Sequence, residues 1–135
     1  MVESTQAGRR YSDPIPTAET QPFWDAAQEG KLLLRHSVET GRAHWYPRSI
    51  CPFTGSATEW REASGRGRIY SFSVMRRATP SYVMAYVTLE EGPTMATNIV
   101  ECDPDTLRIG DPVTVTFVTT EGGFALPVFR PEAAR

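Results

Sequence analysis

The sequence predicts a mainly β protein in which a short helix and a small ribbon of paired turns precede a five-stranded barrel. Three observations predict this order. Apolar residues recur at helical spacing near residue 23, two glycine-ended turns follow at residues 37–41 and 51–55, and from residue 59 onward apolar and polar residues alternate with a period of two. A period of two is the spacing of a half-buried strand.

The helix is predicted from an apolar stripe between two boundary residues. Thr20 can serve as the N-cap and Gly30 stops the segment. Phe23, Ala26 and Ala27 share one face at i, i+3 and i+4 spacing, which is typical of a short amphipathic helix. We expect this face to dock onto a partner or onto the ribbon.

The two turns resemble a metal-binding pair that lacks most of its ligands. A zinc ribbon presents four thiolates from two C-x-x-C-G turns, and the glycine after each second ligand lets the backbone turn tightly around the ion. Both glycines are present here, but Ser37, Thr40 and Thr54 stand at three of the four ligand positions. Hydroxyls do not ionise near neutral pH, so Cys51 alone would not hold zinc. We predict a ribbon without metal.

Other metal or thiol chemistry at the ribbon is the alternative. An unusual site would recruit Cys51, Glu39, His36 and His44, although histidines on strand edges are usually solvated or hydrogen-bonded. Cys51 beside a histidine could also be a nucleophile, but a packed small hydrophobe is the simpler interpretation. Without metal, the ribbon would depend on hydroxyl-to-backbone bonds and apolar contacts. The residues expected to supply them are Ser37, Thr40, Thr54, Trp45, Phe53 and Trp60.

Five strands are predicted after the ribbon, with a capped helical turn at residues 103–107 between the third and the fourth. They cover residues 69–76, 83–89, 94–102, 113–117 and 125–129. In the first, Tyr70, Phe72 and Val74 alternate with Ile69 and Ser71. An antiparallel set of this kind fits a small closed barrel such as the OB-fold.

Two arginine pairs flank the first barrel strand. Gly65-Arg66-Gly67-Arg68 could be a phosphate-binding loop, because glycines expose backbone N–H groups and arginines add charge. The alternative is a kink where the strand begins. Arg76 and Arg77 form a second cationic spot at the far end, either a ligand contact or a solvated rim.

Composition excludes several classes. With 14 basic and 16 acidic residues, the net charge of -2 gives no electrostatic reason to expect nucleic acid or an anionic membrane. No apolar run approaches the roughly 20 residues that span a bilayer, and the N-terminus lacks the regions of a signal peptide, so we expect a cytoplasmic protein. Cys51 and Cys102 are too few for a disulfide framework, and Cys102 is interpreted as a buried strand end.

Three regions are predicted along the chain. Residues 1–19 are polar and interrupted by prolines, which indicates a flexible arm, either disordered or laid over a neighbour. Residues 20–62 hold the helix and the degenerate ribbon. Residues 63–131 form the barrel domain.

Several motifs, in order, resemble the DUF35 proteins. They are Pro22-Phe23-Trp24-Asp25, Glu29-Gly30-Lys31-Leu32-Leu33-Leu34, the two turns, Ser64-Gly65-Arg66-Gly67-Arg68-Ile69-Tyr70-Ser71-Phe72, Arg108-Ile109-Gly110-Asp111-Pro112-Val113 and Leu126-Pro127-Val128-Phe129-Arg130-Pro131. The resemblance runs from about residue 22 to residue 131. It implies a helical N-terminus, a rubredoxin-like zinc ribbon and a C-terminal OB-fold, with the missing thiols placing only the metal in doubt.

The resemblance also implies a function. Members of that family are usually accessory subunits of thiolase-like enzymes or of acyl-CoA hydratases and aldolases. We therefore expect a noncatalytic subunit of an acyl-CoA-processing complex, as a homo- or hetero-oligomer, with no firmly bound cofactor. Acyl-CoA is the expected ligand, and its phosphates would meet Arg66, Arg68, Arg76 and Arg77.

Two functions of other classes stay open. A stand-alone enzyme acting on acyl thioesters would need a nucleophile or base, for which Cys51, His36 and His44 are the candidates. No G-x-S-x-G motif is present. An OB-fold module that binds nucleic acid would need a positive groove, which this charge balance does not supply.

Overall fold

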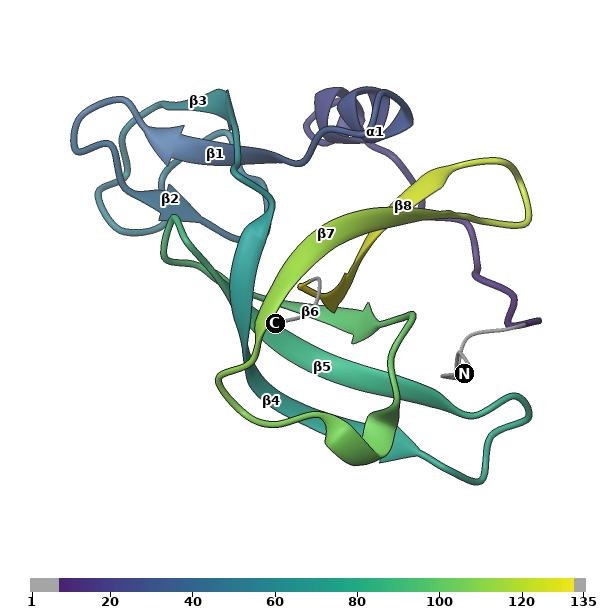
Figure 1. Ribbon diagram of the computed structural model, residues 1–135. Helices are drawn as coiled ribbons and strands as arrows, with labels where there is room; N and C mark the ends of the chain where they lie inside the picture. Colours follow the sequence, from purple (N-terminus) through teal and green to yellow (C-terminus); the bar gives the residue numbers. More distant parts are fainter. Residues whose placement is uncertain (1–7, 133–135) are drawn as a thin grey trace.

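The computed structural model describes residues 8–132, in which a small ribbon sheet stands beside a barrel and one helix lies next to both (Figure 1). In chain order the elements are α1 (Gln21–Gln28), β1 (Leu33–Ser37), β2 (Ala43–His44), β3 (Thr58–Glu62), β4 (Arg66–Met75), β5 (Tyr82–Leu89), β6 (Thr94–Ile99), the 3-10 helix η1 (Pro104–Thr106), β7 (Pro112–Thr119) and β8 (Ala125–Pro131). Neither helix in this part of the chain is long and apolar enough to cross a membrane.

The barrel closes in the strand order β4-β5-β6-β8-β7, with β7 pairing back onto β4. This confirms the predicted five-stranded OB-fold barrel. The expectation of a purely antiparallel set is wrong at one place, because β6 and β8 are parallel and pair through Ile99 and Phe129. The helical turn η1 is capped as predicted: the Asp103 side chain accepts a hydrogen bond from the backbone N–H of Asp105.

A bulge in β4 decides which side chains enter the barrel. The register against β5 shifts between Ile69 and Ser71, so Tyr70 points outward and is 65 % exposed. Ile69 is buried, and Phe72 and Val74 pack against the same core. The prediction that Tyr70 shares a face with Phe72 and Val74 is therefore wrong, because one extra residue breaks the period of two.

The ribbon is a three-stranded sheet in the order β2-β1-β3. Strand β3 was not predicted as a separate element. It pairs with the whole of β1, from Leu33 opposite Glu62 to Ser37 opposite Thr58. This pairing places the second glycine-ended turn beside the first. The chain then passes through Ala63, whose backbone N–H donates to the carbonyl oxygen of Leu32, directly into the barrel.

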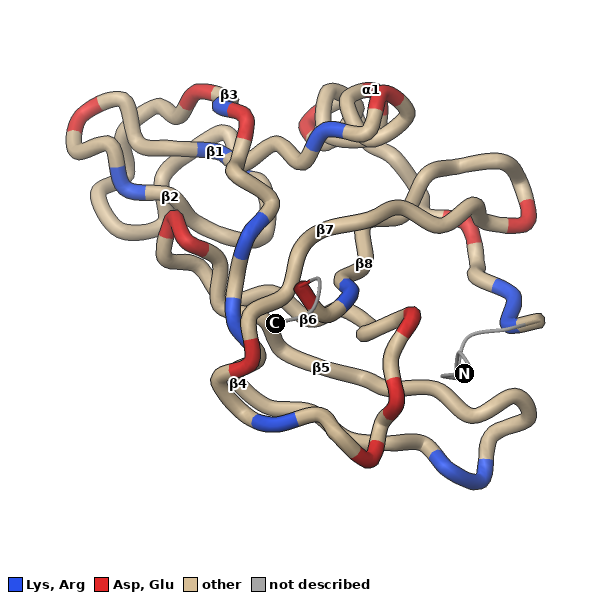
Figure 2. The backbone as a smooth tube through the Cα atoms, in the orientation of Figure 1, with Lys and Arg blue, Asp and Glu red and all other residues tan. Residues whose placement is uncertain are grey.

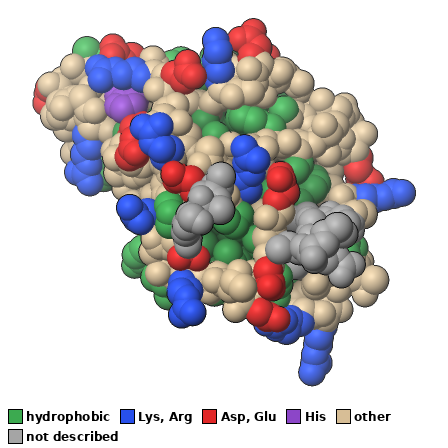
Figure 3. All heavy atoms as spheres, in the orientation of Figure 1, with side chains coloured by type: hydrophobic (Ala, Val, Ile, Leu, Met, Phe, Trp, Pro, Cys, Tyr) green, Lys and Arg blue, Asp and Glu red, His purple; other side chains and the backbone are tan. Residues whose placement is uncertain are grey.

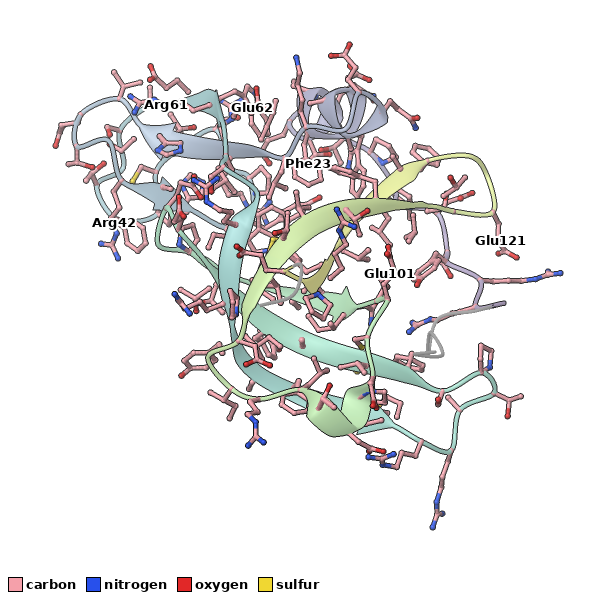
Figure 4. The ribbon with its side chains drawn as sticks, in the orientation of Figure 1. Phe23, Arg42, Arg61, Glu62, Glu101 and Glu121 are labelled. Carbon is pink, nitrogen blue, oxygen red and sulfur yellow. The ribbon has the colours of Figure 1, made fainter. Side chains whose placement is uncertain are left out.

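Helix α1 packs at the junction of ribbon and barrel. Its buried residues are Phe23, Trp24 and Ala27 rather than the predicted set with Ala26, and Thr20 occupies the N-cap position without a side-chain capping bond. The Phe23 ring lies 4.9 Å from the ring of Trp24 and 5.5 Å from that of Trp45 in the ribbon. Figure 4 shows Phe23 beneath the helix.

One continuous core links the three parts. Buried side chains of the helix, the ribbon and the barrel belong to the same cluster, among them Phe23, Leu34, Ala43, Ile69 and Phe129. Such a cluster is the sign of a single cooperative unit. The helix therefore docks on the ribbon and the barrel of its own chain.

Residues 8–20 lie against their own chain, first at the barrel and then at the ribbon. Tyr11 is buried, and Asp13 Oδ1 accepts hydrogen bonds of 2.7 Å from Thr120 Oγ1 and from the backbone N–H of Gly122. These bonds hold the pKa of Asp13 below its usual range. Glu19 Oε2 accepts from the backbone N–H of Ser49 at 2.7 Å. The first seven residues of the predicted arm lie outside the described residues.

Candidate functional site

Both ribbon turns keep the backbone of a metal-binding knuckle. The N–H of Gly41 donates to the carbonyl oxygen of Ser37 at 2.8 Å, and the N–H of Gly55 donates to that of Cys51 at 2.9 Å. The two glycines have φ values of 78° and 75°, a region that side chains rarely tolerate. The glycines are thus required by the turns whether or not an ion is bound.

Hydroxyl groups fill the space where the thiolates of a zinc ribbon would meet. Ser37 Oγ accepts from the backbone N–H of Thr40 at 3.1 Å and lies 3.3 Å from Ser56 Oγ, which in turn lies 2.6 Å from Thr54 Oγ1. The backbone N–H of Phe53 donates to Cys51 Sγ at 3.4 Å. This network joins the two turns, as the ribbon without metal requires.

The donor set does not fit zinc. Only Cys51 offers a thiol, and its pKa is lowered mainly by a hydrogen bond from the Thr54 side chain and further by the backbone N–H groups of Phe53 and Thr54. Residues 8–132 contain no group of three or more His, Cys, Asp or Glu side chains that could hold a metal ion. Hydroxyl ligands cannot replace thiolates around a soft cation.

The two histidines of the ribbon are buried and hydrogen-bonded to the backbone, which is one of the two states expected for them. His36 Nδ1 lies 3.1 Å from the carbonyl oxygen of Gly41 and must donate its proton, because a carbonyl only accepts. His44 Nε2 accepts from the backbone N–H of Arg48 at 3.2 Å. Burial lowers the pKa of His44, and the charge of Arg35 adds to the effect. Both rings serve the ribbon structure.

The first arginine pair lies within β4 rather than in a loop before it. Arg66 donates two hydrogen bonds to the Glu90 carboxylate at 2.8 and 2.9 Å, which raises the pKa of Arg66 and lowers that of Glu90. Arg68 Nη1 donates to the carbonyl oxygen of Gly110 at 3.0 Å. Both arginines line a hollow of about 270 Å³ that Glu132 also borders.

The glycines beside these arginines are explained by packing. A Cβ at Gly67 would stand 2.7 Å from the carbonyl oxygen of Thr88, and Gly65 has a φ of 81° with the Val115 side chain against it. Close approach of β5 therefore accounts for Gly67, and the positive φ accounts for Gly65 at the start of the strand, where the alternative interpretation placed a kink. Contact of the arginines with phosphate stays a prediction.

The second arginine pair stands at the opposite end of β4. Arg76 Nη2 donates to Asp105 Oδ1 at 2.8 Å, and Arg77 is exposed in the following turn. Arg68 and Arg76 are separated by most of a ten-residue strand, a span of roughly 26 Å at the usual rise per residue. One phosphate group cannot contact both pairs.

The tips of the ribbon expose an apolar surface, which we call the ribbon patch. It consists of Val38, Tyr46, Ile50 and Phe53, with exposed fractions between 38 % and 58 %. The Arg42 guanidinium lies 3.3 Å from the Phe53 ring centroid, and Figure 4 shows Arg42 at the outer side of the ribbon. Basic and acidic side chains are interspersed over the face drawn in Figure 3, which has no extended positive groove.

Comparison with known proteins identifies both parts of the fold. Residues 24–59 match the family model described as ChsH2, rubredoxin-like zinc ribbon domain, and residues 60–118 match that of the ChsH2 C-terminal OB-fold domain. The chain is 39 % identical over 108 residues to a DUF35 domain-containing scaffold protein of Methanothermobacter thermautotrophicus, covering 73 % of this chain and 81 % of that one.

Two further relatives differ in length from each other. The chain is 35 % identical over 139 residues to a probable enoyl-CoA hydratase alpha subunit of Thermomonospora curvata, and the match covers 96 % of this chain but 43 % of that protein. Among solved structures, a chain of the Ltp2-ChsH2(DUF35) aldolase superposes with a TM-score of 0.78 and 30 % identity, covering 88 % of this chain and 98 % of that one.

Proposed function

Because the chain belongs to the DUF35 family, we propose that it is a noncatalytic accessory subunit of an acyl-CoA-processing complex. Its catalytic partner would be a thiolase-like, hydratase or aldolase subunit. The names of its relatives support this assignment, since they include a scaffold protein, a hydratase alpha subunit and a component of an aldolase.

The ribbon patch is the observation on this chain that carries the proposal. Four large apolar side chains of this small ribbon are exposed. Exposed apolar residues grouped on one part of a surface are typical of protein interfaces. The ribbon would bind the catalytic subunit. The barrel, which α1 joins to the ribbon, would lie beside the acyl-CoA.

The residues considered for catalysis have structural roles that support a noncatalytic subunit. Cys51 accepts a backbone hydrogen bond within its turn, and His36 and His44 are each bonded to the backbone. Substituting these three residues in the assembled complex should leave the turnover per catalytic subunit unchanged at saturating substrate. A loss of the chemical step would instead favour the stand-alone enzyme.

The coenzyme A phosphates are proposed to meet one arginine pair, not both. Arg66 and Arg76 are each paired with a carboxylate and would have to exchange it for a phosphate, whereas Arg68 donates to a carbonyl and Arg77 is exposed. Calorimetric titration of coenzyme A into the complex would compare R68Q with R77Q. Weaker binding in one variant locates the phosphates, and unchanged binding in both would remove these residues from the ligand site.

The test of the proposed function is assembly with a catalytic subunit encoded beside this chain. Serine at both Ile50 and Phe53 should weaken the complex at least about thirtyfold, because buried interface anchors dominate binding energy. The control is I109S, since Ile109 is even more exposed than Ile50 and Phe53 but precedes barrel strand β7. A catalytic subunit that is fully active and stable without this chain would contradict the proposal.

A further inference from the structure

A hollow on the outer side of the barrel is lined by one cation among uncharged residues. Its volume is about 390 Å³, and it lies between β5, β6 and β8. Among the residues that line it are Arg9, Tyr82, Met84, Asn98 and Pro127. Arg9 is the one charged residue among all the described residues that border it.

The Arg9 guanidinium is held in place by aromatic rings. Its central carbon lies 3.5 Å from the ring centroid of Tyr82 and 5.2 Å from that of Tyr11. Stacking on aromatic faces fixes the orientation of a guanidinium and leaves its N–H groups free to donate. The fork of N–H groups on the Arg9 guanidinium is thus oriented before any ligand binds.

One end of this fork is a buried donor that has no acceptor. Arg9 Nη1 is buried and finds no hydrogen-bond partner among residues 8–132. A buried N–H of a charged group without an acceptor is costly, more so than for a neutral group. An acceptor from outside the described chain would remove that cost.

The barrel face next to the hollow has the composition of an interface. Strands β5 and β6 contain no charged residue, and β5 is uncoloured along its length in Figure 2. Met84 and Tyr86 project from this face and are about half exposed. Tyrosine and methionine are enriched, and charged residues are depleted, at the centres of protein interfaces.

The charge at the hollow indicates an acidic partner. Within residues 8–132, Arg9 is the one charged residue that lines the hollow, whereas Glu90 and Glu91 in the β5–β6 turn and Glu101 after β6 lie at other edges of this face. A carboxylate would be complementary to the Arg9 guanidinium. A phosphate usually gathers several basic groups, but this hollow offers a single guanidinium, which matches one carboxylate.

We propose that the hollow binds a carboxylate-bearing segment of a partner protein, with the carboxylate on Arg9 and a neighbouring apolar side chain against Met84 and Pro127. The identification of that partner with the catalytic subunit rests on the proposed function. The hollow lies on the barrel and is separate from the ribbon patch, so the two surfaces would contact different parts of the partner.

The first experiment tests the hollow on the isolated chain with defined probes. Two capped pentapeptides, one with Leu-Glu-Leu at its centre and one with Leu-Gln-Leu, are titrated into 15N-labelled protein and followed by NMR. The glutamate peptide should shift the amide signals of Ala96 and Asn98, and the shifts should saturate below about 10 mM peptide. The R9Q substitution should weaken the affinity for this peptide at least about tenfold. The control R10Q should match the wild type, because Arg10 is exposed and contacts Glu121.

Three results of that titration would overturn the inference. They are equal binding of the glutamine peptide, no shift with either peptide, and the same shifts produced by inorganic phosphate at lower concentration.

The second experiment measures the affinity of the complex with the catalytic subunit. A loss of about thirtyfold in R9Q but less than twofold in R10Q supports the inference. Equal affinities overturn it and leave the proposed function intact, whereas no complex with any version overturns the proposed function.

Discussion

Restoring three thiols should restore zinc binding to the ribbon. In the triple variant S37C/T40C/T54C, the turns would present four thiolates together with Cys51, on a backbone that already has both glycine turns. Four sulfurs at 2.3 Å from a tetrahedral ion are about 3.8 Å apart. The Ser37 and Thr54 side chains both lower the pKa of Cys51, and both hydroxyls lie beside Ser56 Oγ, so these three ligand positions already face the same part of the ribbon.

The expected gain in stability follows from mass action. At a free zinc concentration a thousand times the dissociation constant, an ion that binds only the folded state adds about 4 kcal/mol to the free energy of unfolding. At about 4 °C per kcal/mol for a domain of this size, the melting temperature should rise by about 15 °C. Native mass spectrometry should find one zinc per chain, and a chelator should reverse the shift.

Two controls make the zinc experiment decisive. The wild-type chain should keep its melting temperature when zinc or a chelator is added. Adding C51S to the triple variant should remove most of the zinc-dependent shift, because a thiolate is lost. Stoichiometric zinc in the wild-type chain, or a triple variant that folds but binds no zinc, would refute the argument from donor chemistry.

Three further predictions concern the core, the barrel and the pH dependence of stability. F23A should lower the free energy of unfolding by about 3–5 kcal/mol in denaturant titrations, because the ring is fully buried between two other aromatic rings; a cost below about 1 kcal/mol would contradict its place in the shared core. G67A should cost about 1–3 kcal/mol, because Gly67 has no positive φ but a Cβ there would collide with the Thr88 carbonyl oxygen; no measurable cost would contradict this close approach. The lowered pKa of His44 means that the unfolded chain binds the proton first, so stability should fall as pH drops below about 6.5; H44Q, which keeps an acceptor, should remove that slope, and an unchanged slope would assign it to another group.

The sequence predicts the order of the elements well because the residues that begin and end each element are local signals. Glycines at the two ribbon turns, the period of two in the barrel strands and the capped turn after Cys102 each specify their own structure. The degenerate ligand set could likewise be identified from residue types alone, since a hydroxyl is a poor zinc ligand in any fold.

What the sequence does not predict depends on contacts between distant residues. The bulge at Tyr70 is fixed by pairing with β5, and the buried face of α1 is fixed by the junction of ribbon and barrel, where Trp24 replaces Ala26. The hollow at Arg9 combines a residue from the predicted arm with three barrel strands. A polar, proline-rich segment gives no local sign that Tyr11 will be buried.

The core that is shared by α1, the ribbon and the barrel has a consequence for how the ribbon tolerates hydroxyls at the ligand positions of a zinc ribbon. In a free-standing zinc ribbon the ion supplies the folding free energy, so the first ligand substitution unfolds it. Here Leu34 and Ala43 of the ribbon are anchored in the same cluster as Phe129 of the barrel. Packing on α1 and the barrel therefore supplies folding free energy that an isolated ribbon would take from the ion, so hydroxyls at the ligand positions are compatible with a folded ribbon.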